Sequence, residues 1–232
     1  MSAGKVSGNW PRSIHDAPDN YEPTARDALH LLERQTTLLF EPGTKWDYSN
    51  SGYVVLGQII EKVAGERYRD FMLNEIFKPL GMNNSEIYDE MRRRAPNHAS
   101  SYTRDGLDYR NIDYTPVSLI YGEGNISSTL EDMYRWDQAL YGEKLVKQST
   151  LAQAFTPGRL SDGSRTDYGF GWRIGNWGGV PYYEHGGGWL GFRTYIRRYP
   201  QLHLTVVIAS NLAEVRPSVL LDKVAEIYVR DQ

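Results

Sequence analysis

The feature that most constrains the fold is a change of hydrophobic period near residue 165. Before it, apolar residues recur at helical spacing, as Val54, Val55, Ile59 and Val63 do. After it, aromatic residues alternate with glycine in Tyr168-Gly-Phe-Gly-Trp172. A repeat of about 3.6 residues indicates a helix, and a repeat of about two indicates a strand. The order along the chain therefore predicts helices first and a sheet afterwards, an α+β arrangement.

Five helices are expected in the first part of the chain. The string Ser128-Thr129-Leu130-Glu131 has the form of a capping box, and Gly65 supplies a stop signal. Pro79 should lie just beyond the third helix, because proline disrupts a helix interior. The first expected helix begins at Thr24, with Ala28, Leu31 and Leu32 on one face. The second and third cover 51–64 and 68–77. The fourth runs from the capping box through Leu140, and the fifth covers 148–155.

Three strands and a closing helix are expected in the second part. The strands are predicted over 168–174, 191–199 and 202–210, the last two joined at Pro200-Gln201 as a hairpin. The final helix begins at Pro217, with an apolar stripe of Val219, Leu220, Val224 and Ile227. So small a sheet exposes an edge, and we expect an upstream segment or another chain to cover it.

Two stretches show no clear period. Residues 1–23 are polar and contain three prolines, so an irregular segment is expected there. Residues 85–120 are too long for a structureless loop in a compact domain, so short irregular elements or a functional loop are expected. The expected organisation is an irregular segment over 1–23, a mostly helical region over 24–160, and strands with a closing helix over 161–232.

Composition excludes several classes of partner. The formal charge of −3 and a pI near 6.0 argue against nucleic acid and anionic membranes, which require a concentrated basic face. The basic cluster Arg92-Arg93-Arg94 is expected to be solvated surface. The chain has no cysteine, and its histidines lack metal-ligand spacing, so we expect neither a metal nor a cofactor. No apolar run matches a signal peptide or a membrane span.

Two short motifs are candidates for chemistry. The first is Tyr48-Ser49-Asn50, directly before a strong helix. The second is the run from His185 through Gly188, which is expected at a strand edge just ahead of another strand. Taken alone, a tyrosine at a helix entrance usually packs, and an asparagine there usually caps. Glycines after a polar side chain let a backbone approach a ligand and present amide hydrogens to it.

Together with their surroundings, these motifs resemble the serine β-lactamase-like family, which includes class C β-lactamases, D-alanyl-D-alanine carboxypeptidases and related esterases. Residues 40–57 resemble the region around the family's Tyr-x-Asn motif. Four further segments follow in the family's order, namely Ile76–Met82, Gly122–Asp132, Tyr168–Trp172 and His185–Gly187. The last of these is similar to the family's third motif, Lys-Thr-Gly or His-x-Gly.

The resemblance implies a β-lactamase/transpeptidase-like fold. In that fold an antiparallel sheet is flanked by helices, and an all-helical region is inserted in the chain. Two amino-terminal strands and the helix that bears the nucleophile belong to the fold, and we expect them to be missing from this chain. They would cover the open sheet edge. The resemblance also suggests a periplasmic or secreted full-length parent, although this chain shows no signal peptide.

The family's mechanism is acyl transfer from a serine in a Ser-x-x-Lys motif. The string occurs at Ser2-Ala3-Gly4-Lys5, but Gly4 and the absence of a following apolar stripe disfavour a helix there. We therefore expect the nucleophile to lie outside this chain.

The resemblance assigns roles to the two motifs. Tyr48 would be the general base, and because a phenol ordinarily titrates near pH ~10 it needs positive charge nearby. His185 would occupy the third motif as a mostly neutral group. Asn50 would hydrogen-bond the substrate or the lysine. Gly186 and Gly187 would line the substrate site, and Gly188 would offer one amide of the oxyanion hole.

Two functions follow from these assignments. The first is a serine hydrolase acting on an ester, a β-lactam or a D-alanyl peptide, with this chain inactive by itself. A histidine at 185 favours esterase or peptidase activity over β-lactamase activity. The second is a non-catalytic binding module of the same fold. Its partners would be peptidoglycan-like peptides or a chain that supplies the missing elements.

Overall fold

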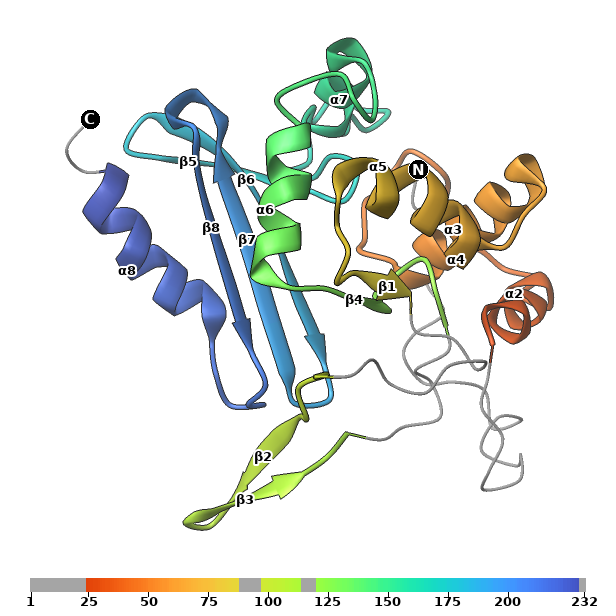
Figure 1. The fold of residues 1–232 in the computed structure, drawn as a ribbon. Coiled ribbons are helices and arrows are strands. Elements are labelled where there is room, and N and C mark those ends of the chain that lie inside the picture. The colour runs from red at the N-terminus through yellow and green to blue at the C-terminus, as the bar shows by residue number, and fades with distance from the viewer. Residues whose placement is uncertain (1–23, 88–96, 114–119, 230–232) are drawn as a thin grey trace. The chain divides into compact units, whose positions relative to one another are not determined.

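The computed structural model describes residues 24–87, 97–113 and 120–229, in two compact units (Figure 1). The first unit comprises Met1–Arg94, Thr115–Asp132 and Arg159–Ser164. The second comprises Ala95–Tyr114, Met133–Gly158 and Arg165–Gln232. The expectations for residues 1–23 and for the arginine cluster at 92–94 lie outside the described residues. The expected division at 23 and at 160 stays a prediction.

The first unit is mainly helical, as its apolar periodicity predicts. A complete capping box at Thr24 opens the first helix, and Gly65 closes the second in the left-handed conformation at φ 73°. Both boundary signals are thereby confirmed. The helices are α2 (Ala25–Glu33), α3 (Asn50–Ala64), α4 (Tyr68–Phe71), the π-helix η1 (Met72–Phe77) and α5 (Lys78–Leu80).

The expected end of the third helix before Pro79 is wrong. The chain stays helical through Leu80 and turns only at Gly81, which has φ 70°. Pro79 lies in the first turn of α5, where a residue without an N–H group is tolerated. The preceding π-helical turn separates α5 from α4, so the proline does not interrupt a continuous α-helix.

The core of the first unit joins α2 to α3. Ala25, Ala28, Val54 and Ile120 are buried together, and the ring of Tyr121 packs against them. The apolar stripe of α3 is only partly covered, since Val63 is 82% exposed. A short ladder completes the unit, with β1 (Glu86–Ile87) pairing antiparallel with β4 (Ile126–Ser127).

Helix α6 (Leu130–Ala139) passes from the first unit into the second. Its predicted cap is shifted by one residue. The hydroxyl of Thr129, not that of Ser128, accepts the bond from the N–H of Asp132, at 3.2 Å. Ser128 instead bonds Ser85, with 2.8 Å between the two hydroxyl oxygens. The helix itself begins where the sequence predicts.

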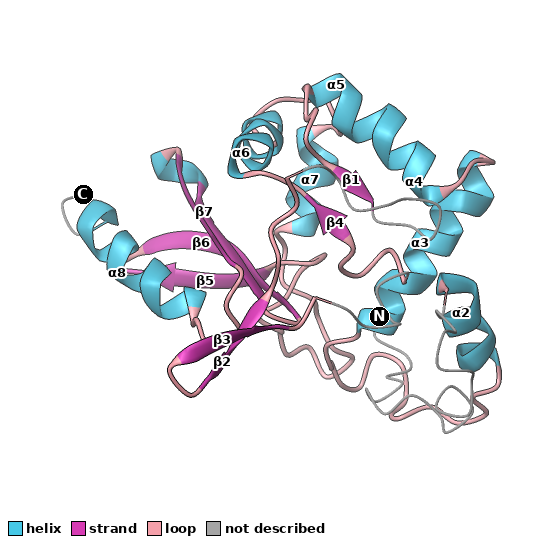
Figure 2. Cartoon of the chain, turned by 60° about the horizontal axis from the view of Figure 1, so that its bottom comes forward, coloured by secondary structure: helices cyan, strands magenta, loops and turns pink. Residues whose placement is uncertain are grey.

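A four-stranded antiparallel sheet lies in the second unit, in the order β5-β6-β7-β8. Its strands are β5 (Arg173–Trp177), β6 (Val180–Trp189), β7 (Phe192–Tyr199) and β8 (Leu204–Ser210). Figure 2 draws the strands in magenta and labels β5, β6 and β7. The predicted hairpin is confirmed, with the 3₁₀ turn η3 (Pro200–Leu202) joining β7 to β8. A separate hairpin pairs β2 (Tyr102–Asp105) with β3 (Asp108–Asn111), which confirms short elements within 85–120.

Two strand predictions need correction. The segment 168–172 is not a strand, because Gly171 takes φ 78° and the N–H of Gly169 bonds the carbonyl of Trp172. The alternating pattern there belongs to a bend, and β5 begins only at Arg173. The sheet also contains β6, which is not among the three predicted strands. His185, expected at a strand edge, lies inside it.

Neighbouring side chains on β7 define the two faces of this sheet. Arg197 reaches Asp222 of α8 (Pro217–Val229), at 2.9 Å from Nη2 to Oδ1. Arg198, the next residue, pairs with Asp137 of α6. Successive side chains on a strand point to opposite faces, so α8 covers one face and α6 lies on the other (Figure 1).

The closing helix is confirmed, but its predicted buried stripe is wrong. Val219, Leu220 and Ile227 are 49%, 47% and 68% exposed. The buried face instead follows i, i+4 spacing. It comprises Pro217, Leu221, Ala225 and Val229. Ala225 lies in a cluster with Tyr199 of β7, where its small side chain lets the helix approach the sheet closely.

Candidate active site

Tyr48 and Asn50 lie at the amino-terminal end of α3, in the first unit. The hydroxyl of Ser49 accepts the bond from the N–H of Gly52, at 3.2 Å, so Ser49 is the helix cap. Asn50 is the first helical residue and is exposed, so its amide does not serve as the cap. Tyr48 is half-buried in the extended segment that leads into the helix.

His185 lies in β6 and is held by a tyrosine that sequence reasoning did not single out. The hydroxyl of Tyr168 is 2.8 Å from Nε2 of His185, and the two rings meet edge to face, with their centroids 6.0 Å apart. Tyr168 is buried, with 7% of its surface exposed. A buried tyrosine bonded to one ring nitrogen holds the imidazole in a fixed orientation.

Burial lowers the pKa of His185 below its ordinary value, and the positive charge of Arg173 acts in the same direction. A bond with the backbone of Gly186 and the charge of Glu184 oppose the shift without cancelling it. The imidazole is therefore neutral at pH 7. A neutral ring can accept a proton or donate a hydrogen bond, but it brings no positive charge to a neighbouring phenol.

The glycines after His185 have packing reasons of their own. A Cβ at Gly186 would meet the ring of Tyr195 at 2.6 Å, and one at Gly187 would meet the hydroxyl of Thr194 at 2.6 Å. Gly188 has room for a side chain, since a Cβ there would lie no closer than 3.5 Å to the side chain of Arg193. Close packing with β7 thus accounts for the first two glycines whether or not a ligand approaches them.

The predicted site residues form two groups. Tyr48 and Asn50 stand together before and at the start of α3, and His185 stands with its glycines on β6. The first group belongs to the first unit and the second group to the second unit. That the two groups line one cleft stays a prediction.

One further carboxyl in the first unit has an altered environment. Burial raises the pKa of Glu123, in the turn between Gly122 and Gly124. Gly122 has φ 96°, and its α-carbon lies close to the carbonyl of Tyr53 in α3. The sequence marks Gly122–Asp132 as a family landmark but gives no signal for the burial of Glu123.

Neither a metal site nor a membrane-spanning helix is found among the described residues. Within 24–87, 97–113 and 120–229, no three His, Asp or Glu side chains are grouped so as to hold a metal ion. The helices in these ranges also lack the length and apolarity needed to cross a bilayer.

Related proteins are similar to this chain over most of its length. A penicillin-binding protein of Bacillus subtilis (strain 168) is 37% identical over 201 residues, which is 79% of this chain and 44% of the relative. A D-aminopeptidase of Cereibacter sphaeroides is 28% identical over 185 residues, which is 80% of this chain and 36% of the enzyme. The chain thus spans less than half the length of these relatives.

The fold is shared with a solved structure. The octameric penicillin-binding protein homologue of Pyrococcus abyssi superposes with a TM-score of 0.78 over 94% of this chain and 50% of that chain, at 24% identity. A likeness at this identity concerns the fold. The β-lactamase/transpeptidase-like arrangement expected from the sequence is confirmed. A sequence model of the Beta-lactamase family matches residues 6–228. The chain therefore belongs to the beta-lactamase family, which includes penicillin-binding proteins.

Proposed function

We propose that this chain is part of a serine hydrolase that cleaves an amide or ester next to a D-amino acid by way of an acyl-enzyme. The observation that carries the proposal is the family match over residues 6–228, within which Tyr48, Asn50 and His185 all occur. Similarity to a D-aminopeptidase and to a penicillin-binding protein favours D-configured peptides as the substrate class.

In the proposed mechanism, Tyr48 takes the proton of the attacking serine and returns it to the leaving group. His185 is neutral for the reasons given above, so it hydrogen-bonds the substrate carboxylate or carbonyl and does not provide charge. Asn50 is exposed at the start of α3 and hydrogen-bonds the substrate. The acyl-serine is then hydrolysed by water.

We also propose that these 232 residues do not become acylated on their own. The spacing Ser-x-x-Lys occurs once in the sequence, at Ser2–Lys5, and Gly4 falls inside it. A glycine in a helix interior lowers helix stability by about 1 kcal/mol relative to alanine. A lysine one turn after the serine requires a stable helix, and this string does not favour one.

Covalent labelling tests both proposals. Intact-mass analysis after treatment with a fluorescent penicillin and with a fluorophosphonate should show no adduct on this chain. A longer version that includes any in-frame upstream Ser-x-x-Lys should gain one adduct, and Tyr48→Phe in that version should slow labelling by at least about 10²-fold. An unlabelled longer version that still binds a D-alanyl-D-alanine peptide saturably would favour the non-catalytic binding module instead.

A further inference from the structure

A pocket of about 380 Å³ opens in the second unit, on the face of the sheet that carries α6. Its walls come from Leu140 and Tyr141 directly after α6, from α7 (Gln148–Ala154), from β6 and from the end of β7. Pockets of about 300–1,000 Å³ are of the size that holds small organic ligands. Nothing in the proposed chemistry uses this pocket.

Aromatic rings form the apolar part of the wall, and their packing holds them in place. Phe155 stacks on Tyr183 of β6 with 4.1 Å between ring centroids and 18° between planes. Tyr141 stacks on His203 with centroids 4.7 Å apart. Because these rings are braced by partners, the wall is largely formed before any ligand arrives. A flat aromatic ligand would complete the stack at low cost in side-chain entropy.

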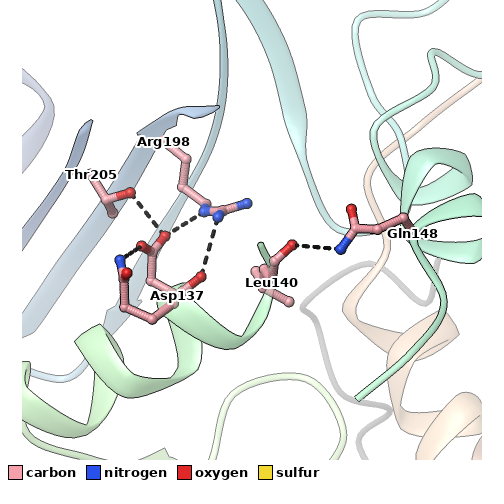
Figure 3. Close-up of polar contacts among 6 residues, drawn as sticks. Asp137, Leu140, Gln148, Arg198 and Thr205 are labelled. Carbon is pink, nitrogen blue, oxygen red and sulfur yellow. Dashed lines mark hydrogen bonds and ion pairs between the residues drawn. The ribbon is translucent and has the colours of Figure 1, made fainter. Parts of the chain in front are cut away.

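Hydrogen-bond donors lie at the base of the pocket. Arg198 has 1% of its side chain exposed, and its guanidinium carbon lies 4.9 Å from the ring centre of Tyr141. Its Nε bonds the carboxylate of Asp137, and its Nη2 bonds the carbonyl of the same residue at 3.3 Å (Figure 3). These bonds use two of the five N–H groups that a guanidinium carries.

The hydroxyl of Tyr141 is a second donor at this pocket. The hydroxyl of Tyr141 is buried and has no hydrogen-bond partner among the described residues. Buried polar groups are nearly always paired, so an unpaired one that lines a pocket indicates a missing acceptor. Gln148 also lines the pocket, and its amide donates to the carbonyls of Leu140 and Gly142. Figure 3 shows the bond to Leu140.

We infer that this pocket binds a small aromatic carboxylate. The rings of Phe155 and Tyr183 would stack on its aromatic part, and Arg198 and Tyr141 would donate to its carboxylate. A guanidinium matches the two oxygens of a carboxylate in geometry and charge. Asp137 already offsets the charge of Arg198, so binding rests on stacking and hydrogen bonds together, and an affinity in the micromolar to millimolar range is expected.

The test measures binding of 2-naphthoate to the whole 232-residue chain by saturation-transfer NMR and calorimetry. Ala152 is exposed and lines the pocket from α7, so Ala152→Phe should fill its mouth and weaken binding at least tenfold. Thr150 is exposed on the same helix but does not line the pocket, so Thr150→Phe is the matched control and should bind as the parent does. Circular dichroism establishes that both variants fold.

Two comparisons test the ligand chemistry. Tyr141→Phe keeps the ring and removes the donor, so it should weaken 2-naphthoate several-fold. The neutral 2-naphthylmethanol should bind at least fivefold more weakly than 2-naphthoate. The inference is overturned if the parent chain shows no saturable binding, if Ala152→Phe binds as well as Thr150→Phe does, or if the neutral alcohol binds as tightly as the carboxylate. The experiment requires no catalytic activity, so its outcome is separate from that of the proposed function.

Discussion

His185 is the residue whose protonation the structure defines most clearly. Its folded-state pKa is lowered, chiefly by burial, so the unfolded chain binds the proton more readily. The resulting stability is fully present above the unfolded value of about 6.5 and is lost as the pH falls toward the folded value. An NMR titration should place the midpoint of its ring resonance below about 6.5.

The His185→Gln variant supplies both the assignment and the control for that titration. Its spectrum should lack the resonance in question, and its free energy of unfolding should fall less than that of the parent between pH ~7 and ~5. A ring midpoint at or above 6.5, or identical pH profiles for the two proteins, would contradict the assigned environment.

The ion pair between Asp137 and Arg198 gives a second prediction at this scale. Their side chains are 2% and 1% exposed, and Thr205 also donates to the same carboxylate oxygen at 2.8 Å (Figure 3). Asp137→Ala would leave the guanidinium buried without a counter-charge, so it should lower the free energy of unfolding by about 3–5 kcal/mol. Urea denaturation followed by circular dichroism measures the change.

The matched control is a solvent-exposed pair. Arg110 and Asp105 are 3.6 Å apart in the β2–β3 hairpin, and their side chains are 64% and 67% exposed. Exposed pairs contribute roughly 0–1 kcal/mol, so Asp105→Ala should have little effect. A similar loss in the two variants would show that burial of the first pair does not determine its contribution.

The turn before β4 provides a prediction at the scale of an element. Gly122 has φ 96°, and a Cβ there would lie 2.4 Å from the carbonyl oxygen of Tyr53 in α3. Gly122→Ala must therefore strain the backbone and push the turn away from the helix, at a cost of at least about 2 kcal/mol. Gly124 in the same turn has open space and serves as the control. Thermal unfolding should show a lower midpoint for the first variant only.

Element positions were predictable wherever a local signal coincided with the tertiary environment. The left-handed glycine at 65 and the Pro200-Gln201 turn between β7 and β8 are such cases. The full extent of β6 was missed because His185 and the three glycines after it have no apolar alternation. Their extended backbone is imposed by pairing with β5 and β7 on either side, and pairing of this kind overrides intrinsic preference.

The candidate site was likewise predictable from sequence only in part. Both motif positions were recognisable from sequence because they resemble family landmarks. The bond from Tyr168 to His185 was not, since the two residues are 17 positions apart and meet only through the bend around Gly171. The buried face of α8 was mistaken for a similar reason. The helix has two apolar stripes, and the one that contains the small Ala225 packs against the sheet.

At the scale of the whole molecule, α6 belongs to both compact units. Near its start, the carboxylate of Asp132 accepts bonds from the N–H of Asn84 at 2.7 Å and from the hydroxyl of Ser85 at 2.9 Å, within the first unit. One turn and a half later, Asp137 pairs with Arg198 within the second. A helix forms cooperatively, so loss of structure at one end of α6 weakens the other.

We therefore expect the two units to unfold in one transition. Replacing Trp10 and Trp46 by phenylalanine leaves four tryptophans, all in the second unit, at positions 136, 172, 177 and 189. In that background, fluorescence reports the second unit, while far-ultraviolet circular dichroism reports both. Gly122→Ala lies in the first unit, yet it should lower the urea midpoint of both signals equally, because α6 transmits the destabilisation. A shift in circular dichroism without one in fluorescence would mean that the shared helix does not couple the units.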